Sequence, residues 1–307
     1  MEWICPVCGK ALRPDAGSYR CENRHCFDRA KSGYVNLLPP SPAAKRHGDD
    51  RRMVQARTQF LSRGYYAHLM QAVAALCAEL TGSAPVIVDA GCGEGAYTKH
   101  VYDVLTAQGK TPQIAGIDIS TDALRHAAKL LPEAGFCAAS TAHMPLADAC
   151  ADLILNIFSP FMAAEFRRVL RDGGYLVRVV PMARHLWELK AAVYDTPYEN
   201  PPTDLSAEGF TLLRRLEVKK TILLASQEDV QALFQMTPYY YKTGEKDQKK
   251  LDALSSLSVA TEFEIAVYQA SAAQEPQIEC HTRQRSRQNR LRSDCQKPRR
   301  VSPRTAK

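Results

Sequence analysis

The feature that most constrains the fold is a glycine-rich stretch, APVIVDAGCGEGAYTKHVYDVL, at residues 84–105. The apolar run at 86–88 predicts a short buried strand that Asp89 ends, and a helix is expected to start near Ala96. Three glycines stand between them: Gly91, Gly93 and Gly95. Glycine is needed where a backbone turns sharply and comes close to a ligand, so the stretch predicts a strand, a ligand-binding loop and a helix.

Further short strands are expected after this one. The segment 113–120 ends its strand in Asp118, and 135–140 is a third strand. Residues 142–160 lead through a loop into a fourth strand, and 170–181 contain a glycine turn followed by a fifth. Strands that alternate with helices indicate an α/β fold with a mostly parallel sheet covered by helices on both faces.

The charges in the glycine loop distinguish two classes of cofactor. A dinucleotide site holds a pyrophosphate on a G-x-G-x-x-G loop at a helix N-terminus. Here the loop reads D-A-G-C-G-E-G, and Asp89 and Glu94 would repel a pyrophosphate but suit an amino group and a sulfonium. We therefore expect S-adenosylmethionine, with a sheet for another nucleotide as the alternative. Asp118 is expected to accept hydrogen bonds from the ribose, unless it is a surface carboxylate that ends a strand.

A second constraint is the cysteine spacing in WICPVCGKALRPDAGSYRCENRHCFD, residues 3–28. Cys5 and Cys8 form one pair, and Cys21 is followed by His25 and Cys26. This spacing brings soft ligands around one tetrahedral metal. The alternatives are disulfides, which need an oxidising compartment, or unrelated buried cysteines. The start of the chain has no basic leader or apolar core, so we expect the chain to stay in the reducing cytoplasm. Thiols bind metal there more readily than they form disulfides, so we expect zinc.

The spacing leaves the fourth ligand open between His25 and Cys26. Gly9 permits the tight turn after the first pair. A closed site with four ligands is structural, so zinc is expected to hold a fold and not to perform chemistry. The zinc-binding segment would then present basic and aromatic groups to a partner, or it would be a stabilising clip without a recognition role.

Between these two features the chain is expected to change from a connector to helices. Residues 31–58 carry three prolines that stop regular structure: Pro39, Pro40 and Pro42. From 50 to 80 the apolar spacing becomes helical, and Gly64 interrupts it. We expect two helices joined at RGYYAH, residues 63–68.

Composition excludes some classes of protein. The chain has 307 residues, of which 45% are hydrophobic and 24% charged, enough for one large domain and a small one. No apolar run approaches the roughly 20 residues of a membrane-spanning helix. Residues 271–307 hold ten Lys or Arg against three Asp or Glu, a balance of +7 that equals the charge of the whole chain. We expect this tail to be disordered, as an RNA-tethering arm or a poorly constrained extension.

Five motifs together resemble one family of enzymes. They are CPVC, YRCENRHCFDRAKSGYVNLLP, VDAGCGEGAYT, RHLWELK and FQMTP, in continuous order over residues 3–270. The chain is similar to the bacterial 23S ribosomal RNA guanine-N1 methyltransferases. The resemblance implies a class I (Rossmann-like) methyltransferase domain with a small N-terminal zinc-binding domain that contacts RNA. It also implies a guanine substrate in a 23S rRNA hairpin loop that lines the peptide exit tunnel, and a homodimer.

The resemblance also implies particular site residues. Its zinc ligands match Cys5, Cys8, Cys21 and His25, which favours His25 over Cys26. Its cofactor contacts match Tyr66, Gly93, Glu94 and His185. Both Tyr66 and His185 are expected at the carboxyl ends of the strands, where open sheets bind ligands. As alternatives, Tyr66 is a core aromatic and His185 a helix-cap residue.

The target base is expected near the end of the fourth strand, in NIFSP. Asn156 and Pro160 lie where related methyltransferases hold a base, and a strand-ending turn is the alternative for Asn156. Guanine N1 carries a proton at neutral pH, so methyl transfer needs an acceptor for that proton. Glu188 and Asp28 are candidates without support from the sequence. A loop guanine costs less to extract than a paired one.

We thus expect a zinc-binding RNA-recognition segment at 1–36, a linker and helices at 37–83, the methyltransferase domain at 84–270 and the tail at 271–307. Local patches such as Arg20, Arg24, Arg29 and Lys31 would supply RNA affinity, because the body of the chain is neutral. A methyltransferase for a small molecule or lipid is an alternative, against which the zinc segment and TPYYYK at 237–242 argue. A third hypothesis is a ribosome-binding protein that keeps the cofactor without activity.

Overall fold

A computed structural model describes residues 2–39 and 48–272 of the chain. The prolines at 40 and 42, and the tail from 273 onward, lie outside the described residues. No helix among the described residues is long and apolar enough to cross a bilayer.

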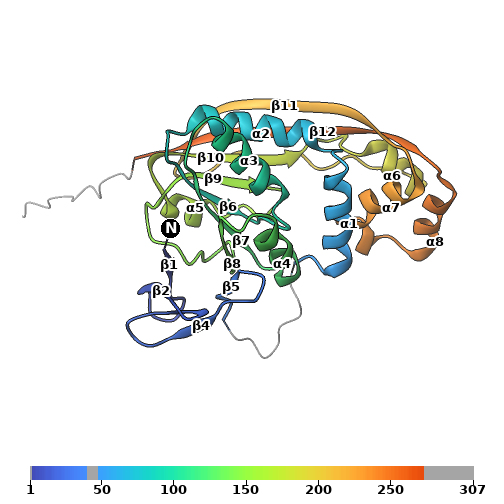
Figure 1. Cartoon of the computed structure of the whole chain (residues 1–307). Coiled ribbons are helices and arrows are strands. Elements are labelled where there is room, and N and C mark those ends of the chain that lie inside the picture. The colour runs from blue at the N-terminus through green and yellow to red at the C-terminus, as the bar shows by residue number, and fades with distance from the viewer. Residues whose placement is uncertain (1, 40–47, 273–307) are drawn as a thin grey trace, which may run out of the picture. The chain divides into compact units, whose positions relative to one another are not determined.

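The N-terminal segment folds into a small antiparallel sheet of four strands (Figure 1). These strands are β1 (Trp3–Ile4), β2 (Ala11–Asp15), β3 (Ser18–Arg20) and β4 (Cys26–Asp28). Gly17 has a φ of 91° at the turn from β2 to β3, a conformation that glycine adopts without strain. We call residues 3–28 the ribbon.

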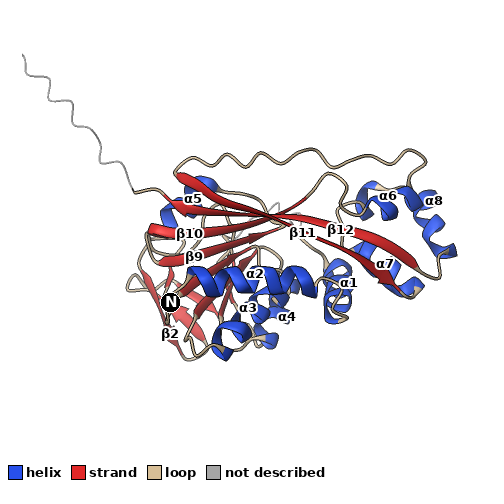
Figure 2. Cartoon of the chain, turned by 90° about the horizontal axis from the view of Figure 1, so that it is seen from above, coloured by secondary structure: helices blue, strands red, loops and turns tan. Residues whose placement is uncertain are grey.

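The second sheet has eight strands in the order β11-β12-β10-β9-β6-β7-β8-β5 (Figure 2). Six of them pair in parallel: β5 (Val35–Asn36), β6 (Val86–Ala90), β7 (Gln113–Asp118), β8 (Gly135–Ala138), β9 (Ala151–Ile157) and β10 (Leu170–Pro181). The five strands predicted from the sequence are all present, so the expected mostly parallel α/β sheet is confirmed. The first of them extends past Asp89 to Ala90.

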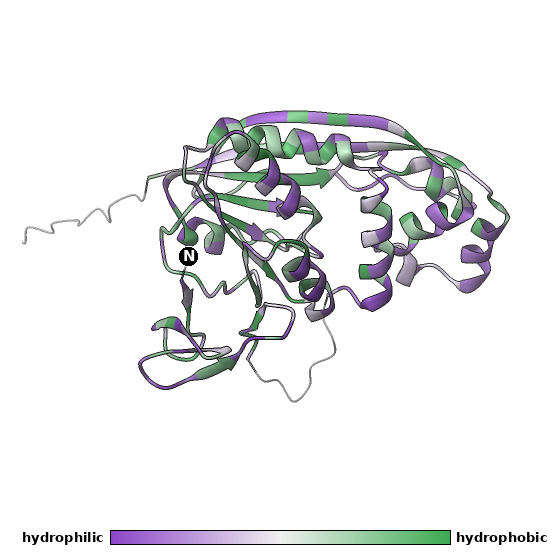
Figure 3. Ribbon diagram, viewed as in Figure 1, coloured by the Kyte–Doolittle hydropathy of each residue, from purple (hydrophilic) through white to green (hydrophobic). Residues whose placement is uncertain are grey.

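Two long strands were not predicted from the sequence. β11 (Phe210–Leu224) and β12 (Leu257–Ala270) pair with each other, and β12 pairs with β10, all antiparallel. β11 lies at one edge of the sheet, and apolar and charged residues alternate along part of it, as the stripes of Figure 3 show. Arg214, Arg215, Lys219 and Lys220 lie along it, a composition that discourages pairing with another chain at an open edge.

The predicted pair of helices is confirmed at 51–80. α1 (Arg51–Ser62) begins where the Asp50 carboxylate accepts a hydrogen bond from the Met53 amide at 3.0 Å. α2 (Ala67–Leu80) follows Gly64, whose φ is 79°. The other α-helices are α3 (Ala96–Ala107), α4 (Thr121–Leu130), α5 (Ala163–Val169), α6 (Trp187–Val193), α7 (Gln227–Gln235) and α8 (Glu245–Gln248).

Apolar side chains fill both faces of the large sheet. One face packs against α2 and α3 through residues such as Ile87, Leu155 and Val177, and the other packs against α5 through Ile154 and Leu176. The alternation follows from the period of two along a strand. Because both faces are covered, the parallel strands are apolar nearly throughout, as Figure 3 shows for the centre of the sheet.

The ribbon is part of this packing. Trp3 is 5% exposed and belongs to the same apolar cluster as Ile154 and Leu176. The Ile4 amide donates to the Pro145 carbonyl at 2.8 Å. β5 then adds itself to the sheet beside β8. The large sheet thus includes β5, which lies just before the expected boundary at 36–37. That boundary stays a prediction.

A glycine on β7 provides a test of the packing between β7, β8 and the glycine loop. A Cβ on Gly116 would overlap the Phe136 ring and lie 2.9 Å from Cys92 Sγ. Phe136 is 3% exposed, so its ring has no room to move. We expect Gly116→Ala to lower the free energy of unfolding by about 1–3 kcal/mol, as overpacking does. Urea denaturation measures the change.

Gly82→Ala is the matched control, because nothing lies within 4 Å of its added Cβ and its φ is not positive. It should leave the stability unchanged. Equal stability of both variants would contradict the packing described here.

Candidate active site and metal centre

A cavity of about 800 Å³ opens at the carboxyl ends of the parallel strands. It is lined by the glycine loop and by residues that follow β7, β8 and β9, with further walls from α1 and from residues 236–239. Ligands of open α/β sheets bind at this edge. Of the predicted cofactor residues, seven line the cavity: Tyr66, Asp89, Gly91, Gly93, Glu94, Asp118 and His185.

The glycine loop adopts a conformation that side chains resist. Its φ angles are 93° at Gly91, 55° at Gly93 and 87° at Gly95. A Cβ on Gly91 would overlap Ser159, and one on Gly95 would lie 2.9 Å from Ala127. Gly95 is thus required for close packing of the loop on α4, although it does not line the cavity. A Cβ on Gly93 would instead face Arg57, 3.6 Å away.

Asp118 orients the loop as well as facing the cavity. One carboxylate oxygen accepts from the Gly93 amide at 2.9 Å, and the other accepts from the Ser120 amide at 2.7 Å. Burial raises the pKa of Asp118 above its usual value. Each carboxylate oxygen keeps a further lone pair, so the predicted contact to ribose hydroxyls fits this arrangement and stays a prediction.

Two buried polar atoms in the cavity wall have no hydrogen-bond partner in the structure. They are Oε2 of Glu94, which is 4% exposed, and the hydroxyl of Tyr97. A buried polar atom without a partner costs free energy, which a hydrogen-bonding ligand at these atoms would recover. A cofactor with an ammonium, a sulfonium and ribose hydroxyls offers donors and positive charge here. The carboxylates and the unpaired polar atoms of this cavity therefore fit S-adenosylmethionine.

Arg57 on α1 was not identified from the sequence. Its guanidinium pairs with Asp49 and lies 3.8 Å from Glu94 Oε2, and it is also 3.4 Å from the Met236 carbonyl. Nothing in the local sequence RRMVQART distinguishes Arg57 from its neighbouring arginines, because only the fold turns it toward the glycine loop. The cavity thus holds a cation among several carboxylates.

Tyr66 and His185 both line the cavity, with 6.4 Å between their ring centroids, and their contact with the cofactor stays a prediction. His185 is not a helix cap, since Leu186 stands at the N-cap position of α6. Tyr66 is 4% exposed and packs edge-on against Phe60 and Phe263, at 4.9 and 5.0 Å between ring centroids. His185 Nδ1 accepts from the Glu262 amide at 3.1 Å. Burial lowers the pKa of His185 to about 3, so the ring is neutral and carries its proton on Nε2. A neutral ring with this low pKa is unsuited to accept a proton from the substrate.

Asn156 does not line the cavity. It is 1% exposed, and its side-chain amide donates to the Ser159 hydroxyl at 2.5 Å and to the Pro160 carbonyl at 3.2 Å. Asn156 thus holds the turn that ends β9, and its contact with the target base stays a prediction. Glu188 caps the backbone amide of Ala260 at 2.9 Å, outside the cavity wall, and Asp28 lies on β4 of the ribbon.

The four ligand atoms expected for zinc converge in the ribbon. Cys5, Cys8, Cys21 and His25 place one donor atom each within 4.8 Å of one another. His25 Nδ1 lies 3.4 Å from Cys21 Sγ and 3.5 Å from Cys5 Sγ, and Cys8 Sγ lies 3.6 Å from Cys21 Sγ. Four ligands about 2.3 Å from zinc would stand about 3.5–3.8 Å apart, so the set fits a tetrahedral ion. Cys26 is exposed on β4 and is not in the group.

The local backbone explains how a short sequence builds this group. The Gly9 amide donates to the Cys5 carbonyl at 2.9 Å, and the Arg24 amide donates to the Cys21 carbonyl at 2.9 Å. Both donors have positive φ, 71° and 63°. A hydrogen bond from the Lys10 backbone is the main cause that lowers the pKa of Cys8 to about 6. Two similar turns therefore bring one pair of ligands each, and the first favours a thiolate.

Comparisons with known proteins concern the same two parts of the chain. Residues 3–45 match the family described as "RlmA, N-terminal", and residues 88–178 match the family described as "Methyltransferase domain". A Bacillus subtilis (strain 168) protein named as a 23S rRNA (guanine-N1-)-methyltransferase is 30% identical over 275 residues, which cover 86% of this chain and 95% of that protein. The chain belongs to this family.

Two other relatives of the methyltransferase are more similar over a shorter length. A Micromonospora griseorubida protein named as a 23S rRNA (guanine-N1-)-methyltransferase is 39% identical over 205 residues, 60% of this chain and 67% of that protein. A Streptomyces fradiae protein named 23S rRNA (guanine(748)-N1)-methyltransferase is 38% identical over 193 residues, 62% of this chain and 66% of that protein. The expected cofactors, S-adenosylmethionine and structural zinc, are confirmed by the methyltransferase domain and by the zinc ribbon with its cluster of ligands.

The metal centre of the methyltransferase allows His25 and Cys26 to be separated. We expect His25→Ala to lose its zinc, because three ligands leave the tetrahedron open to water and chelators. Cys26→Ala should keep its zinc, since Cys26 is exposed and stands apart from the ligand group. Metal analysis after dialysis against a weak chelator measures both. Zinc retained by His25→Ala and lost by Cys26→Ala would reverse the assignment.

The carboxylates of the cavity predict how cofactor binding depends on pH. Burial raises the pKa of Asp89 to about 7, although Thr98 donates to it at 2.6 Å. A cationic ligand favours the ionised carboxylate, so protons compete with the cofactor below this pKa. We expect the dissociation constant of S-adenosylmethionine to rise about tenfold between about pH 7.5 and about pH 6.

Calorimetric titration at the two pH values checks this prediction. Asp89→Asn should bind more weakly at about pH 7.5 and lose most of the pH dependence. Wild-type affinities that are equal at both values would show that Asp89 does not interact with the charge of the cofactor.

Proposed function

We propose that this chain transfers a methyl group from S-adenosylmethionine to N1 of a guanine in a hairpin loop of 23S rRNA. The relatives carry this activity in their names. We place the cofactor against Tyr66, Glu94, Asp118, His185 and the glycine loop. We also propose that the protein acts in the cytoplasm as a homodimer, which the family resemblance implies.

The observation that supports an RNA substrate most directly is how the ribbon is attached. β5 follows the ribbon and pairs with β8, and the Leu37 amide donates to the Ala138 carbonyl at 2.9 Å. The residues directly after β8, 139–142, line the cavity. The ribbon is therefore anchored to the strand whose end forms a cavity wall. A macromolecule bound to the ribbon could also reach the active site, whereas a small-molecule substrate would have no use for an attached ribbon.

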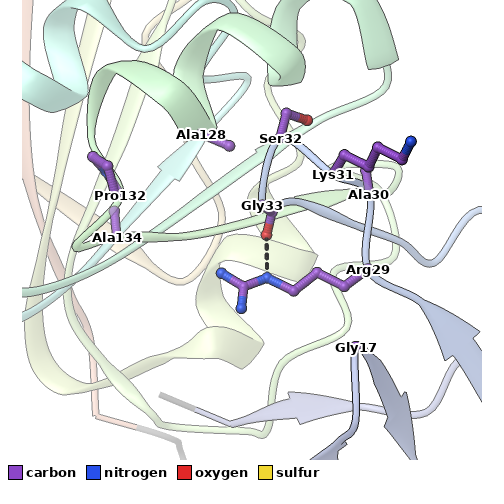
Figure 4. A pocket seen from close by; sticks show the side chains of 9 residues that line it. All are labelled: Gly17, Arg29, Ala30, Lys31, Ser32, Gly33, Ala128, Pro132 and Ala134. Carbon is purple, nitrogen blue, oxygen red and sulfur yellow. Dashed lines mark hydrogen bonds between the residues drawn. The ribbon is translucent and has the colours of Figure 1, made fainter.

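Basic side chains follow the ribbon directly in the chain. Arg29 and Lys31 line a cleft of about 400 Å³, whose other walls include Gly17 of the ribbon, residues of α4 and the loop after it (Figure 4). Their side chains point in different directions, and Arg29 Nε donates to the Gly33 carbonyl at 2.9 Å. Two cations that do not converge on one point suit separate phosphates along a strand better than one small ligand. We assign them to contacts with the RNA backbone.

The reaction makes definite demands on the chain. S-adenosylmethionine supplies the electrophilic methyl group when it is bound. Guanine N1 must lose its proton as it attacks, so the chain has to hold the base in line and leave the proton a route to an acceptor. His185 is neutral and protonated on Nε2, so it is assigned to orientation and not to proton removal. Glu188 and Asp28 are not assigned as the base, because neither lines the cavity.

The test uses protein-free 23S rRNA from a strain that lacks the enzyme. Incubation with labelled cofactor should place the label on one guanine, which blocks reverse transcription at that nucleotide. RNA that stays unlabelled, while a small molecule or lipid from the same extract is methylated, would support the alternative substrate. Binding of rRNA with no transfer to any acceptor would indicate a ribosome-associated protein without activity.

The Cys8→Ser variant tests the role of the ribbon in this reaction. Zinc should be lost and the ribbon should unfold, while the cofactor is bound with near-normal affinity, because none of residues 3–28 lines the cavity. Methylation of the RNA should nevertheless collapse. Cys26→Ser is the matched control and should keep both zinc and activity. Full RNA methylation by zinc-free Cys8→Ser would refute a recognition role for the ribbon.

A further inference from the structure

We propose that Phe158 is the side chain on which the target guanine stacks, an inference that rests on the function proposed above. Phe158 directly follows β9 and lines the cavity. It was not singled out from the sequence, where attention fell on Asn156 and Pro160 on either side of it. Its conformation, its exposure and the way its neighbours hold it each support this role.

The backbone of Phe158 is strained. Its φ is 52°, in the left-handed region that a bulky side chain seldom enters. Glycine, asparagine or aspartate would occupy this position at lower cost. A strained aromatic residue at the edge of a cavity is typical of a residue kept for function, since folding alone would favour a different residue.

Hydrogen bonds on both sides hold the strained turn in place. The Phe158 amide donates to the Val179 carbonyl at 3.3 Å. Asn156 holds the following residues through Ser159 and Pro160, and the Ser159 hydroxyl donates to the Ala90 carbonyl at 2.5 Å. The turn therefore cannot relax without losing contacts to β6 and β10. These contacts give Asn156 a function too, because it positions the turn that carries Phe158.

The Phe158 ring is exposed where a buried core residue would not be. It is 48% exposed, against 0% for Phe263, to which its ring centroid lies 5.4 Å away. Its other aromatic neighbour is Tyr97, at 6.5 Å. An apolar ring left half in solvent beside a cavity suits the flat face of a planar ligand. Bases taken out of an RNA loop are held in this way, by stacking on aromatic side chains.

The position of the ring also suits methyl transfer. Ser159, the next residue, approaches Gly91 so closely that a Cβ there would overlap it. The turn that carries Phe158 is thus in direct contact with the cofactor loop. A reacting nitrogen has to come within about 3–3.5 Å of the methyl carbon, so the base must be held next to this loop. Tyr239 also lines the cavity, but its hydroxyl donates to Asn200 at 3.0 Å and ties it to a polar network.

Substitutions at Phe158 separate a stacking role from a structural one. Phe158→Gly and Phe158→Leu should bind S-adenosylmethionine like the wild type in calorimetry. Both should lose about 10- to 100-fold in kcat/KM for the rRNA hairpin, as loss of a base–aromatic stack does. Phe158→Tyr should keep most of the activity. Phe158→Gly should also melt at the same temperature as the wild type or higher, because it relieves the strained φ.

Ala149→Gly is the control for the stability effect. Ala149 has a φ of 49° and does not line the cavity, so this variant should also melt no lower than the wild type, with unchanged methylation. A fluorescent guanine analogue at the modified position gives a readout that does not depend on turnover. Its emission should change in the same way on binding to the wild type and to Phe158→Tyr, and should differ from both in the complexes with Phe158→Gly and Phe158→Leu.

The outcomes separate this inference from the proposed function. If the wild type methylates the hairpin and Phe158→Leu does so equally well, the stacking role is wrong while the proposed function stands. If Phe158→Leu or Phe158→Gly loses cofactor binding or unfolds, Phe158 is a structural residue. If the wild type does not methylate the hairpin at all, the proposed function and this inference fall together.

Discussion

The structure depends on a close contact between two loops that leave neighbouring strands. β6 and β9 are parallel neighbours, and the loops after them meet where Gly91 leaves room for Ser159. The Ser159 hydroxyl donates to the Ala90 carbonyl, and Asn156 fixes the turn from the other side. Both loops line the cavity, and the second carries Phe158. With the cofactor and the guanine placed as proposed, this contact would set the separation of the two reactants, and a small displacement of either loop would change the geometry of transfer.

The same cavity carries an electrostatic cost, because it gathers buried carboxylates. Asp89, Glu94 and Asp118 are all buried beside the glycine loop, and burial raises the pKa of each. Arg57 offsets part of this cost through its ion pairs, but Glu94 Oε2 still has no hydrogen-bond partner. Carboxylates gathered without enough positive charge are unfavourable until a cationic ligand arrives. S-adenosylmethionine bound as proposed would recover the cost of burying them, whereas an anionic nucleotide would add to it.

The sequence predicts the parts of the molecule that are encoded locally. The glycine loop, the start of α3 at Ala96 and the ligand spacing in the ribbon each depend on residues close together in the chain, and the structure has them where they were expected. β11 and β12 were missed because they are antiparallel additions to a sheet whose other strands follow a βα pattern. Arg57 and Phe158 were missed for a different reason. A buried ion pair and a strained turn arise only when segments distant in sequence meet, and neither leaves a periodic signal.

The ribbon shows how one set of side chains serves two purposes. Cys5 and Cys21 are metal ligands, yet they are 1% and 5% exposed and belong to the apolar cluster that includes Trp3 and Ile154. Zinc binding and packing on the sheet therefore support each other, because both need the ligand turns in the same conformation. α1 and the glycine loop line the cavity. α2 and α3 pack on the face of the sheet opposite to the one that packs against the ribbon. A ribbon held by metal and sheet together keeps a fixed orientation toward the end of β8. This orientation is what a recognition surface needs if it is to deliver one nucleotide of a folded RNA to the turn after β9.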